Sequence, residues 1–113
     1  MKKIIVIEDD KVLREALTAL LCENGYEVQR IIEFDKTEQQ IAEEKADLVL
    51  LDIILPGTNG QEILRNLRRI SDVPVIMLTS KTGETDEILA MSYGADDYIT
   101  KPVSYTHLTL PTI

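Results

Sequence analysis

The sequence predicts an α/β fold in which helices cover a parallel β-sheet. Five short stretches rich in β-branched and apolar residues alternate with four stretches that have helical periodicity. Two of the strand-like stretches, Ile4–Ile7 and Leu48–Leu51, are continuously apolar, as in strands that are buried on both faces. This alternation is typical of parallel strands joined by right-handed crossovers.

Size and charge limit the classes of function. A chain of 113 residues, 44% of them apolar, is enough for one domain with a single modest core. The net charge of −8 disfavours nucleic-acid binding by this chain alone, because phosphates need a concentrated basic surface. The negative net charge instead favours binding of cations or of basic partners. We expect no membrane partner, since no apolar stretch approaches the length of a membrane span and the N-terminal one is too short for a signal peptide.

The single cysteine, Cys22, lies in a helical pattern, where we expect a small residue that faces the core. One cysteine leaves no disulfide or zinc site. A reducing, cytoplasmic location fits this composition.

The first strand, Ile4–Ile7, ends on three consecutive acids, Glu8, Asp9 and Asp10. The next segment, Lys11–Asn24, is predicted to be helical and to end at Gly25. Its apolar stripe comprises Val12, Leu13, Ala16, Leu17, Leu20 and Leu21. Asp10 has an alternative role as the cap of this helix.

The second strand, Tyr26–Ile32, is interrupted by polar residues, which favours a place near the edge of the sheet. Asp35, with Glu38 three residues later, predicts a capping-box start for a helix that runs to about Lys45. The apolar face of this helix is thin, so we expect it to be the least stable helix.

The third strand is the apolar run from Ala46 that ends at Asp52, followed by a Pro-Gly turn. An aspartate that merely caps a turn is the alternative role for Asp52. The loop Ile53–Asn59 leads through Gly60 into a predicted helix. The apolar face of this helix comprises Ile63, Leu64, Leu67 and Ile70.

The fourth strand, Val73–Leu78, is followed by Thr79. A helix is predicted from about Glu84 to Tyr93, and the short fifth strand, Asp97–Thr100, leads into Lys101.

The carboxyl ends of parallel strands meet at one edge of a sheet, where ligands of open α/β sheets bind. Six polar side chains follow strands in this way: Glu8, Asp9, Asp10, Asp52, Thr79 and Lys101. Oxygen ligands of this kind suit Mg²⁺, with Asp9 and Asp52 as direct ligands and Glu8 or Asp10 holding a coordinated water. Lys101 and Thr79 suit contacts with the oxygens of a phosphoryl group. Each residue also has an ordinary structural role, but their convergence favours a site.

Four blocks, Ile7–Asp10, Leu51–Gly60, Met77–Ser80 and Gly94–Pro102, occur in the order of the motifs of a known family. The chain resembles, from Lys2 to Val103, the receiver domain of two-component response regulators. Its acidic cluster and Leu-Pro-Gly turn are most similar to the subfamily that joins a receiver to a winged-helix DNA-binding domain.

The resemblance implies a flavodoxin-like, doubly wound, five-stranded sheet of order 2-1-3-4-5. It also implies a phospho-acceptor at Asp52, a phosphate contact at Lys101, and switch residues at Thr79 and Tyr98. The implied cofactor is magnesium, bound by Glu8, Asp9, Asp52 and the backbone carbonyl of Ile54.

The implied function is signal transduction rather than enzymatic turnover of a substrate. By the resemblance, we expect a sensor histidine kinase to phosphorylate Asp52 and the domain to assist its own magnesium-dependent phosphorylation and dephosphorylation. We also expect an output domain of the full-length protein to regulate transcription.

The chain departs from the family after Val103, where the pattern alternates and the expected fifth helix is missing. We therefore expect a receiver domain over residues 1–103 and a non-family tail of cloning origin over 104–113. Loss of a helix that covers the first helix would favour a non-native or strand-exchanged homodimer.

Three rival functions are weighed. A flavodoxin-like cofactor binder or enzyme needs a glycine-rich phosphate loop, and the sequence has none. An aspartate-nucleophile phosphatase needs a general acid two residues after Asp52, where Ile54 stands. The alternative kept is a receiver-like interaction module that is not phosphorylated. The acid pair Glu8 and Asp9, together with Thr79 and Lys101, argues against it.

Overall fold

The computed structural model describes residues 2–79 and 94–100, and for residues 79 and 98–100 it describes the backbone alone. Several expectations fall outside these residues: the helix from Glu84 to Tyr93, Lys101, the missing fifth helix and the tail over 104–113.

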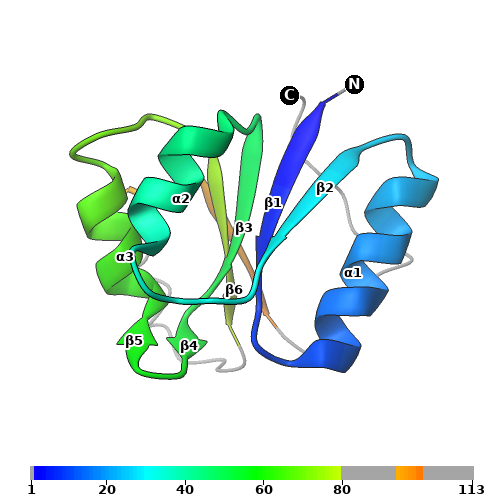
Figure 1. The fold of residues 1–113 in the computed structure, drawn as a ribbon, viewed down its shortest axis with the longest axis horizontal. Coiled ribbons are helices and arrows are strands. Elements are labelled where there is room, and N and C mark those ends of the chain that lie inside the picture. Colours follow the sequence, from blue (N-terminus) through cyan, green and yellow to red (C-terminus); the bar gives the residue numbers. More distant parts are fainter. Residues whose placement is uncertain (1, 80–93, 101–113) are drawn as a thin grey trace.

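Five parallel strands form the central sheet within the described residues, in the order β2-β1-β3-β6-β7 (Figure 1). They are β1 Lys3–Ile7, β2 Glu27–Ile31, β3 Leu48–Asp52, β6 Val75–Thr79 and β7 Asp97–Thr100. Because β4 and β5 belong to a separate hairpin, this is the predicted order 2-1-3-4-5. The flavodoxin-like α/β fold is therefore confirmed, and the polar strand β2 lies at an edge as expected.

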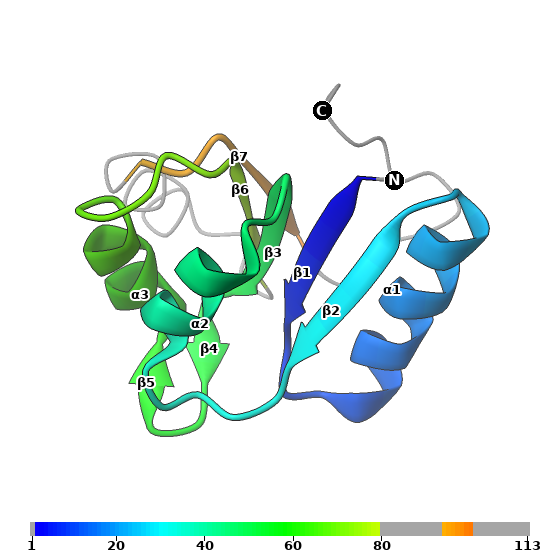
Figure 2. The same cartoon turned by 45° about the horizontal axis from the view of Figure 1, so that its top comes forward.

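The described helices lie on both faces of the sheet. Helix α1 (Lys11–Glu23) covers one face, and α2 (Thr37–Glu44) and α3 (Gly60–Leu67) lie together on the other (Figures 1 and 2). Successive residues of a strand point to opposite faces, so the continuous apolar runs supply two cores. Facing α1 are Ile4, Val6, Leu48 and Leu50, packed with Leu17 and Leu21. Facing α2 and α3 are Ile5, Ile7, Val49 and Leu51, packed with Ile41, Ile63, Leu64 and Leu67.

Helix α1 ends as the sequence predicts, within one residue. Asn24 is its C-cap, and Gly25 follows with a φ of 87°, a left-handed conformation that glycine adopts without strain. The predicted apolar stripe is divided between core and solvent. Leu17 and Leu21 are buried, whereas Val12 is 80% exposed. Cys22 is also exposed, so the expectation that it faces the core is wrong.

The start of α2 differs from the predicted capping box at Asp35. Lys36 is the N-cap, in a left-handed conformation with φ 55°, and its side chain makes no capping hydrogen bond. The side-chain amide of Gln40 instead donates to the carbonyls of Glu33 and Asp35, at 3.1 and 2.9 Å. The only residues of α2 that are fully buried are Thr37 and Ile41, in agreement with the thin apolar face seen in the sequence.

The segment after β3 contains a small hairpin that the sequence analysis treated as a loop. Strand β4 (Ile54–Leu55) pairs antiparallel with β5 (Thr58–Asn59). Pro56 and Gly57 form the connection, and the φ of 72° at Gly57 suits glycine at the third position of such a turn. Ile70 lies beyond the end of α3 and is 57% exposed, so its predicted place on the apolar face of the helix is wrong.

Among residues 2–79 and 94–100, none of the helices has the length and apolar character that crossing a membrane requires.

Candidate functional site

Asp52 is the last residue of β3, a central strand flanked by β1 and β6. It is paired in register with Leu78, and the next amide, that of Ile53, donates to the Leu78 carbonyl at 3.0 Å. Its exposed fraction is 3%. The strand therefore delivers a nearly buried carboxylate to the carboxyl edge of the sheet.

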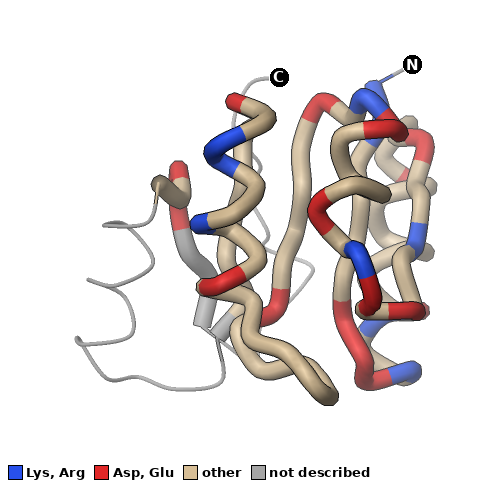
Figure 3. Tube along the Cα trace, turned by 60° about the vertical axis from the view of Figure 1, so that its left-hand side comes forward, with Lys and Arg blue, Asp and Glu red and all other residues tan. Residues whose placement is uncertain are grey.

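The loop between β1 and α1 brings two more carboxylates to the same edge. Glu8 is fully buried and Asp9 is exposed. Each of Glu8, Asp9 and Asp52 offers a carboxylate oxygen, and the three oxygens lie within 4.8 Å of one another. Figure 3 shows acidic segments at the ends of the strands on this edge. Three of the sequence-predicted site residues, from two separate segments of the chain, are thus brought together.

This group fits a hexacoordinate Mg²⁺. Opposite ligands of an octahedral Mg²⁺ are about 4.2 Å apart and neighbouring ones about 3 Å apart. Oxygens within 4.8 Å of one another can therefore bind one ion directly or through a coordinated water, with small side-chain adjustments. The donor set, all carboxylate, is the type that hard cations prefer.

Asp10, the third acid of the cluster, has the structural role that the sequence left open. Its Oδ1 accepts hydrogen bonds from the backbone amides of Val12 at 2.9 Å and Leu13 at 3.2 Å. This is the N-cap arrangement, and it satisfies two amides of the first turn of α1 that have no partner within the helix. Asp10 therefore orients the helix, while Glu8 and Asp9 point their carboxylates at Asp52.

The segment after Asp52 holds that residue in place. The amide of Ile54 donates to Asp52 Oδ1 at 3.2 Å, and the amide of Gly60 donates to the Ile53 carbonyl at 2.7 Å. A Cβ at Gly60 would overlap the Asp52 carbonyl oxygen and lie 2.8 Å from its carbonyl carbon. Only glycine permits this approach. The backbone carbonyl of Ile54 as a metal ligand stays a prediction.

The other predicted residues are placed only in part. Thr79 ends β6 and is paired in backbone register with Thr100 of β7. Tyr98 is paired with Met77. The side chains of Thr79 and Tyr98, and the whole of Lys101, lie outside the described residues, so their roles stay predictions.

Arg14 is a residue that the sequence analysis missed. From the second turn of α1, its Nη1 donates to the carbonyl oxygen of Glu8 at 2.9 Å and to that of Asp9 at 3.4 Å. A signal was present in the sequence, because a residue four positions after the helix cap Asp10 can reach back over the preceding loop.

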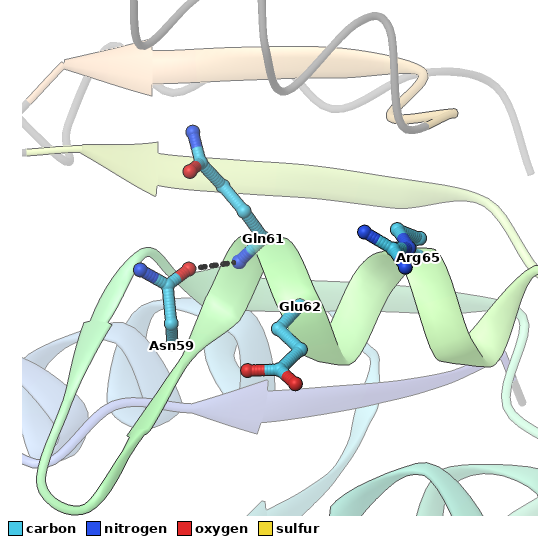
Figure 4. A pocket seen from close by; sticks show the side chains of 4 residues that line it. All are labelled: Asn59, Gln61, Glu62 and Arg65. Atoms are coloured by element: carbon cyan, nitrogen blue, oxygen red, sulfur yellow. Dashed lines mark hydrogen bonds between the residues drawn. The ribbon is translucent and has the colours of Figure 1, made fainter.

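A pocket of about 280 Å³ lies on the outer side of α3 and does not include the acidic group. Figure 4 shows four side chains that line it: Asn59, Gln61, Glu62 and Arg65. Asn59 is the N-cap of the helix, since its Oδ1 accepts from the Gln61 amide at 2.7 Å.

Comparison with known proteins agrees with this geometry. The family model described as the response regulator receiver domain matches residues 4–110. The BeF3-activated N-terminal receiver domain of RstA from Klebsiella pneumoniae is 39% identical, with 90% of this chain and 87% of that chain covered and a TM-score of 0.84.

Two further solved structures are similar. The N-terminal domain of the nisin resistance regulator NsrR is 34% identical, covers 94% of this chain and 90% of that chain, and has a TM-score of 0.83. A two-component response regulator from Clostridium difficile is 26% identical, covers 94% and 88%, and has a TM-score of 0.88. Given the parallel sheet, the acidic group at its carboxyl edge and a family match over nearly the whole chain, this protein belongs to the receiver domain family of response regulators.

Proposed function

We propose that this receiver domain accepts a phosphoryl group on Asp52 from a sensor histidine kinase in the cytoplasm. The observation that carries the proposal is the meeting of Glu8, Asp9 and Asp52 at the carboxyl edge of the sheet, with Asp52 on the central strand. Three acids held this close repel one another unless a cation compensates them, so the arrangement favours a metal-dependent reaction over a purely structural role.

The chemical step is a transfer between two nucleophiles. One carboxylate oxygen of Asp52 attacks the phosphorus of a phosphohistidine on the kinase. The new O–P bond forms as the P–N bond breaks, and the electron pair of that bond stays on the imidazole nitrogen. The product is an acyl phosphate on Asp52, and no oxidant or reductant takes part.

The residues of the chain contribute position and charge. The Ile54 amide, which donates to Asp52 Oδ1, helps to hold the carboxylate that we propose as the nucleophile. Glu8, Asp9 and the carboxylate of Asp52 would hold Mg²⁺, which supplies positive charge to the phosphoryl oxygens. We assign to Lys101 and to the hydroxyl of Thr79 the remaining contacts with these oxygens.

We propose that phosphorylation transmits the signal by changing the protein surface around Thr79 and Tyr98. A phosphoryl group offers new acceptors that attract Thr79, and Tyr98 follows into the space that is vacated. The similarity to RstA supports this reading, because that receiver domain is BeF3-activated and beryllium fluoride resembles a phosphoryl group bound to a carboxylate. We propose a transcriptional output domain, of the winged-helix type, as the intramolecular partner in the full-length protein.

A homodimer is a further proposal about partners. Val12 is 80% exposed and Ala16 is exposed, so part of the apolar stripe of α1 faces solvent. A strand-exchanged or otherwise non-native dimer would cover such surface. Light scattering over a concentration series distinguishes it from a strict monomer.

The function is tested with Mg²⁺ and acetyl phosphate as a small phosphodonor, followed by intact-mass spectrometry. We expect the parent protein to gain one phosphoryl group and the Asp52→Asn variant to gain none. Asp47→Asn is the matched control, because Asp47 precedes the same strand at its other end, where its Oδ2 accepts from the Lys3 amide at 2.8 Å. This control should be phosphorylated like the parent.

Two outcomes contradict the proposal. Phosphorylation of Asp52→Asn to the level of the parent would place the acceptor elsewhere. A folded parent that binds Mg²⁺ but gains no phosphoryl group from acetyl phosphate or from kinases would favour the alternative, an interaction module that is not phosphorylated.

A further inference from the structure

Arg14 links helix α1 to the loop that carries two of the three candidate metal ligands. Its Nη1 donates to the carbonyl oxygens of Glu8 and Asp9, at 2.9 and 3.4 Å. We propose that Arg14 is a positioning residue for the magnesium site, which holds the backbone of this loop so that the carboxylates of Glu8 and Asp9 meet that of Asp52. The inference deepens the proposed function and rests on it for its biological meaning.

Helix α1, which carries Arg14, is firmly anchored on the sheet. Leu17 and Leu21, one and two turns further along α1, are buried in the core on that face of the sheet. The Arg14 amide donates to the Asp10 carbonyl at 2.8 Å, and the Asp10 side chain caps the helix. The loop is thus held at one end by β1, at the other by the cap, and in the middle by Arg14. A loop restrained in this way loses little entropy when its carboxylates bind an ion.

The position of the Arg14 side chain includes one energetically unfavourable feature. Its Nε is buried and has no hydrogen-bond partner among the described residues. A buried N–H without a partner is unfavourable, and such local costs are typical of positions under functional constraint. Arg30 shows the contrast, because it lies on the surface and its Nη1 pairs with the carboxylate of Glu15 at 2.6 Å. Arg14 instead donates to two backbone carbonyls.

The charge of Arg14 and its hydrogen bonds predict opposite effects on metal affinity. A positive charge beside the site repels Mg²⁺, so if charge alone mattered, removing it would tighten binding. If the hydrogen bonds position the loop, removing them weakens binding. Loss of a residue that orients metal ligands typically lowers metal affinity by about tenfold or more. The sign of the change therefore separates the two roles.

The test is calorimetric titration of Mg²⁺ into the whole chain for the parent, Arg14→Gln, Arg14→Lys and Arg30→Gln. We expect Arg14→Gln to raise the Kd for Mg²⁺ about tenfold, and Arg14→Lys to lie between it and the parent, because an ammonium can reach one carbonyl. Arg30→Gln removes the same charge from a residue that does not touch the loop. Its Kd should stay within about twofold of the parent, since exposed charges are screened.

A second readout is amide hydrogen exchange in the metal-free protein. Exchange over residues 8–10 should be faster in Arg14→Gln than in Arg30→Gln, with α1 itself unchanged. A merely structural role would lower the melting temperature and leave the Kd for Mg²⁺ as in the parent.

The proposal is overturned if Arg14→Gln binds Mg²⁺ as tightly as Arg30→Gln or more tightly, or if the parent does not bind Mg²⁺. If Arg14→Gln does not fold, the Kd of Arg14→Lys for Mg²⁺ is compared with that of Arg30→Gln instead. Equal Kd values for these two variants would then overturn the proposal. Failure of the proposed function is separate. A parent that binds Mg²⁺ in an Arg14-dependent way, yet is not phosphorylated on Asp52, would contradict phospho-acceptance and support the positioning role.

Discussion

The residues around Asp52 illustrate how closely backbone and side chain are fitted at the site. Helix α3 begins at Gly60, and the backbone of Gly60 lies directly against that of Asp52. The same contact gives the Gly60 amide a partner in the Ile53 carbonyl, at 2.7 Å. The start of α3 therefore helps to set the position of Asp52.

At Gly60 we predict that alanine destabilises the protein and slows its phosphorylation. The added Cβ overlaps backbone atoms that cannot rotate away, so the free energy of unfolding should fall by about 3 kcal/mol. Gly57→Ala is the control. Gly57 has open space around it and a φ of 72°. Its substitution by alanine should therefore lower the free energy of unfolding only by the strain of that conformation, about 1 kcal/mol. Urea unfolding of both variants measures the difference, and equal losses would contradict the close approach.

Helix α2 is held to the sheet by few contacts, and one of its two fully buried residues is polar. Thr37 is 1% exposed, and its Oγ1 has no hydrogen-bond partner among the described residues. The N-cap of the helix, Lys36, has a left-handed backbone conformation and makes no side-chain capping hydrogen bond. These features give a physical reason for the low stability that its thin apolar face predicts.

For Thr37→Val we predict an increase in the free energy of unfolding of about 1 kcal/mol, because valine has the same shape and removes a buried hydroxyl that lacks a partner. Thr37→Ser keeps the hydroxyl and removes the methyl group, and should lower stability by about 1 kcal/mol. Urea unfolding measures both. A loss of stability in Thr37→Val would indicate that the hydroxyl makes a favourable contact, such as one with a bound water.

The end of α2 is tied to the first strand by an ion pair. Lys3 Nζ lies 2.6 Å from Glu44 Oε2 and 3.7 Å from Glu27 Oε2. The hydrogen bond that Lys3 Nζ donates to the Glu44 carboxylate, with the negative charges of both glutamates, raises the pKa of Lys3 above its ordinary value of 10.5. A raised pKa means that the folded state binds the proton more tightly than the unfolded state. The pair therefore stabilises the protein below pH 10.5 and loses this effect as the pH rises through the folded pKa.

We predict that Glu44→Gln lowers the urea midpoint at neutral pH, and that its difference from the parent shrinks as the pH rises above 10.5. Glu15→Gln is the matched control, because it breaks the surface pair with Arg30, and an arginine keeps its charge over this range. Its difference from the parent should not depend on pH there. A difference for Glu44→Gln that stays constant to about pH 12 would contradict the role of Lys3.

At the scale of the whole molecule, the parallel sheet concentrates negative charge at one edge. Glu8 and Asp9 follow β1, Asp52 ends β3, and their oxygens lie within 4.8 Å. Mutual repulsion destabilises the metal-free fold, and binding of a cation to the folded state alone stabilises it. We therefore expect stability and metal binding to be coupled through the same three side chains.

We predict that Asp9→Asn raises the melting temperature of the metal-free protein by about 2 °C or more, and that it loses most of the stabilisation by Mg²⁺. Asp72→Asn removes an exposed acid that is not in the group, and it should keep the full response to Mg²⁺. Melting curves over a magnesium series measure both. Equal stabilisation of parent and Asp9→Asn by Mg²⁺ would count against the site.

The sequence by itself determined the elements that depend on periodicity and on local chemistry. The order of strands and helices followed from apolar runs and helical stripes, since buried strands must be apolar on both faces. The prediction that Asp52 and Asp9 share one edge needed only the rule that parallel strands end at the same side. Family motifs then assigned roles to Thr79, Tyr98 and Lys101, and these assignments stay predictions.

Only the tertiary structure decided which residues cap the helices, which side chains face solvent and which segments touch at the site, because these features depend on packing. The sequence left Asp10 with two roles, helix cap or holder of a metal-bound water, and the structure shows the cap. Nor did the sequence indicate that Lys36 rather than Asp35 caps α2, or that Cys22 faces solvent, because both depend on how the helices pack against the sheet. The contact of the Arg14 side chain with the loop backbone and that of the Gly60 backbone with Asp52 depend on how the segments pack.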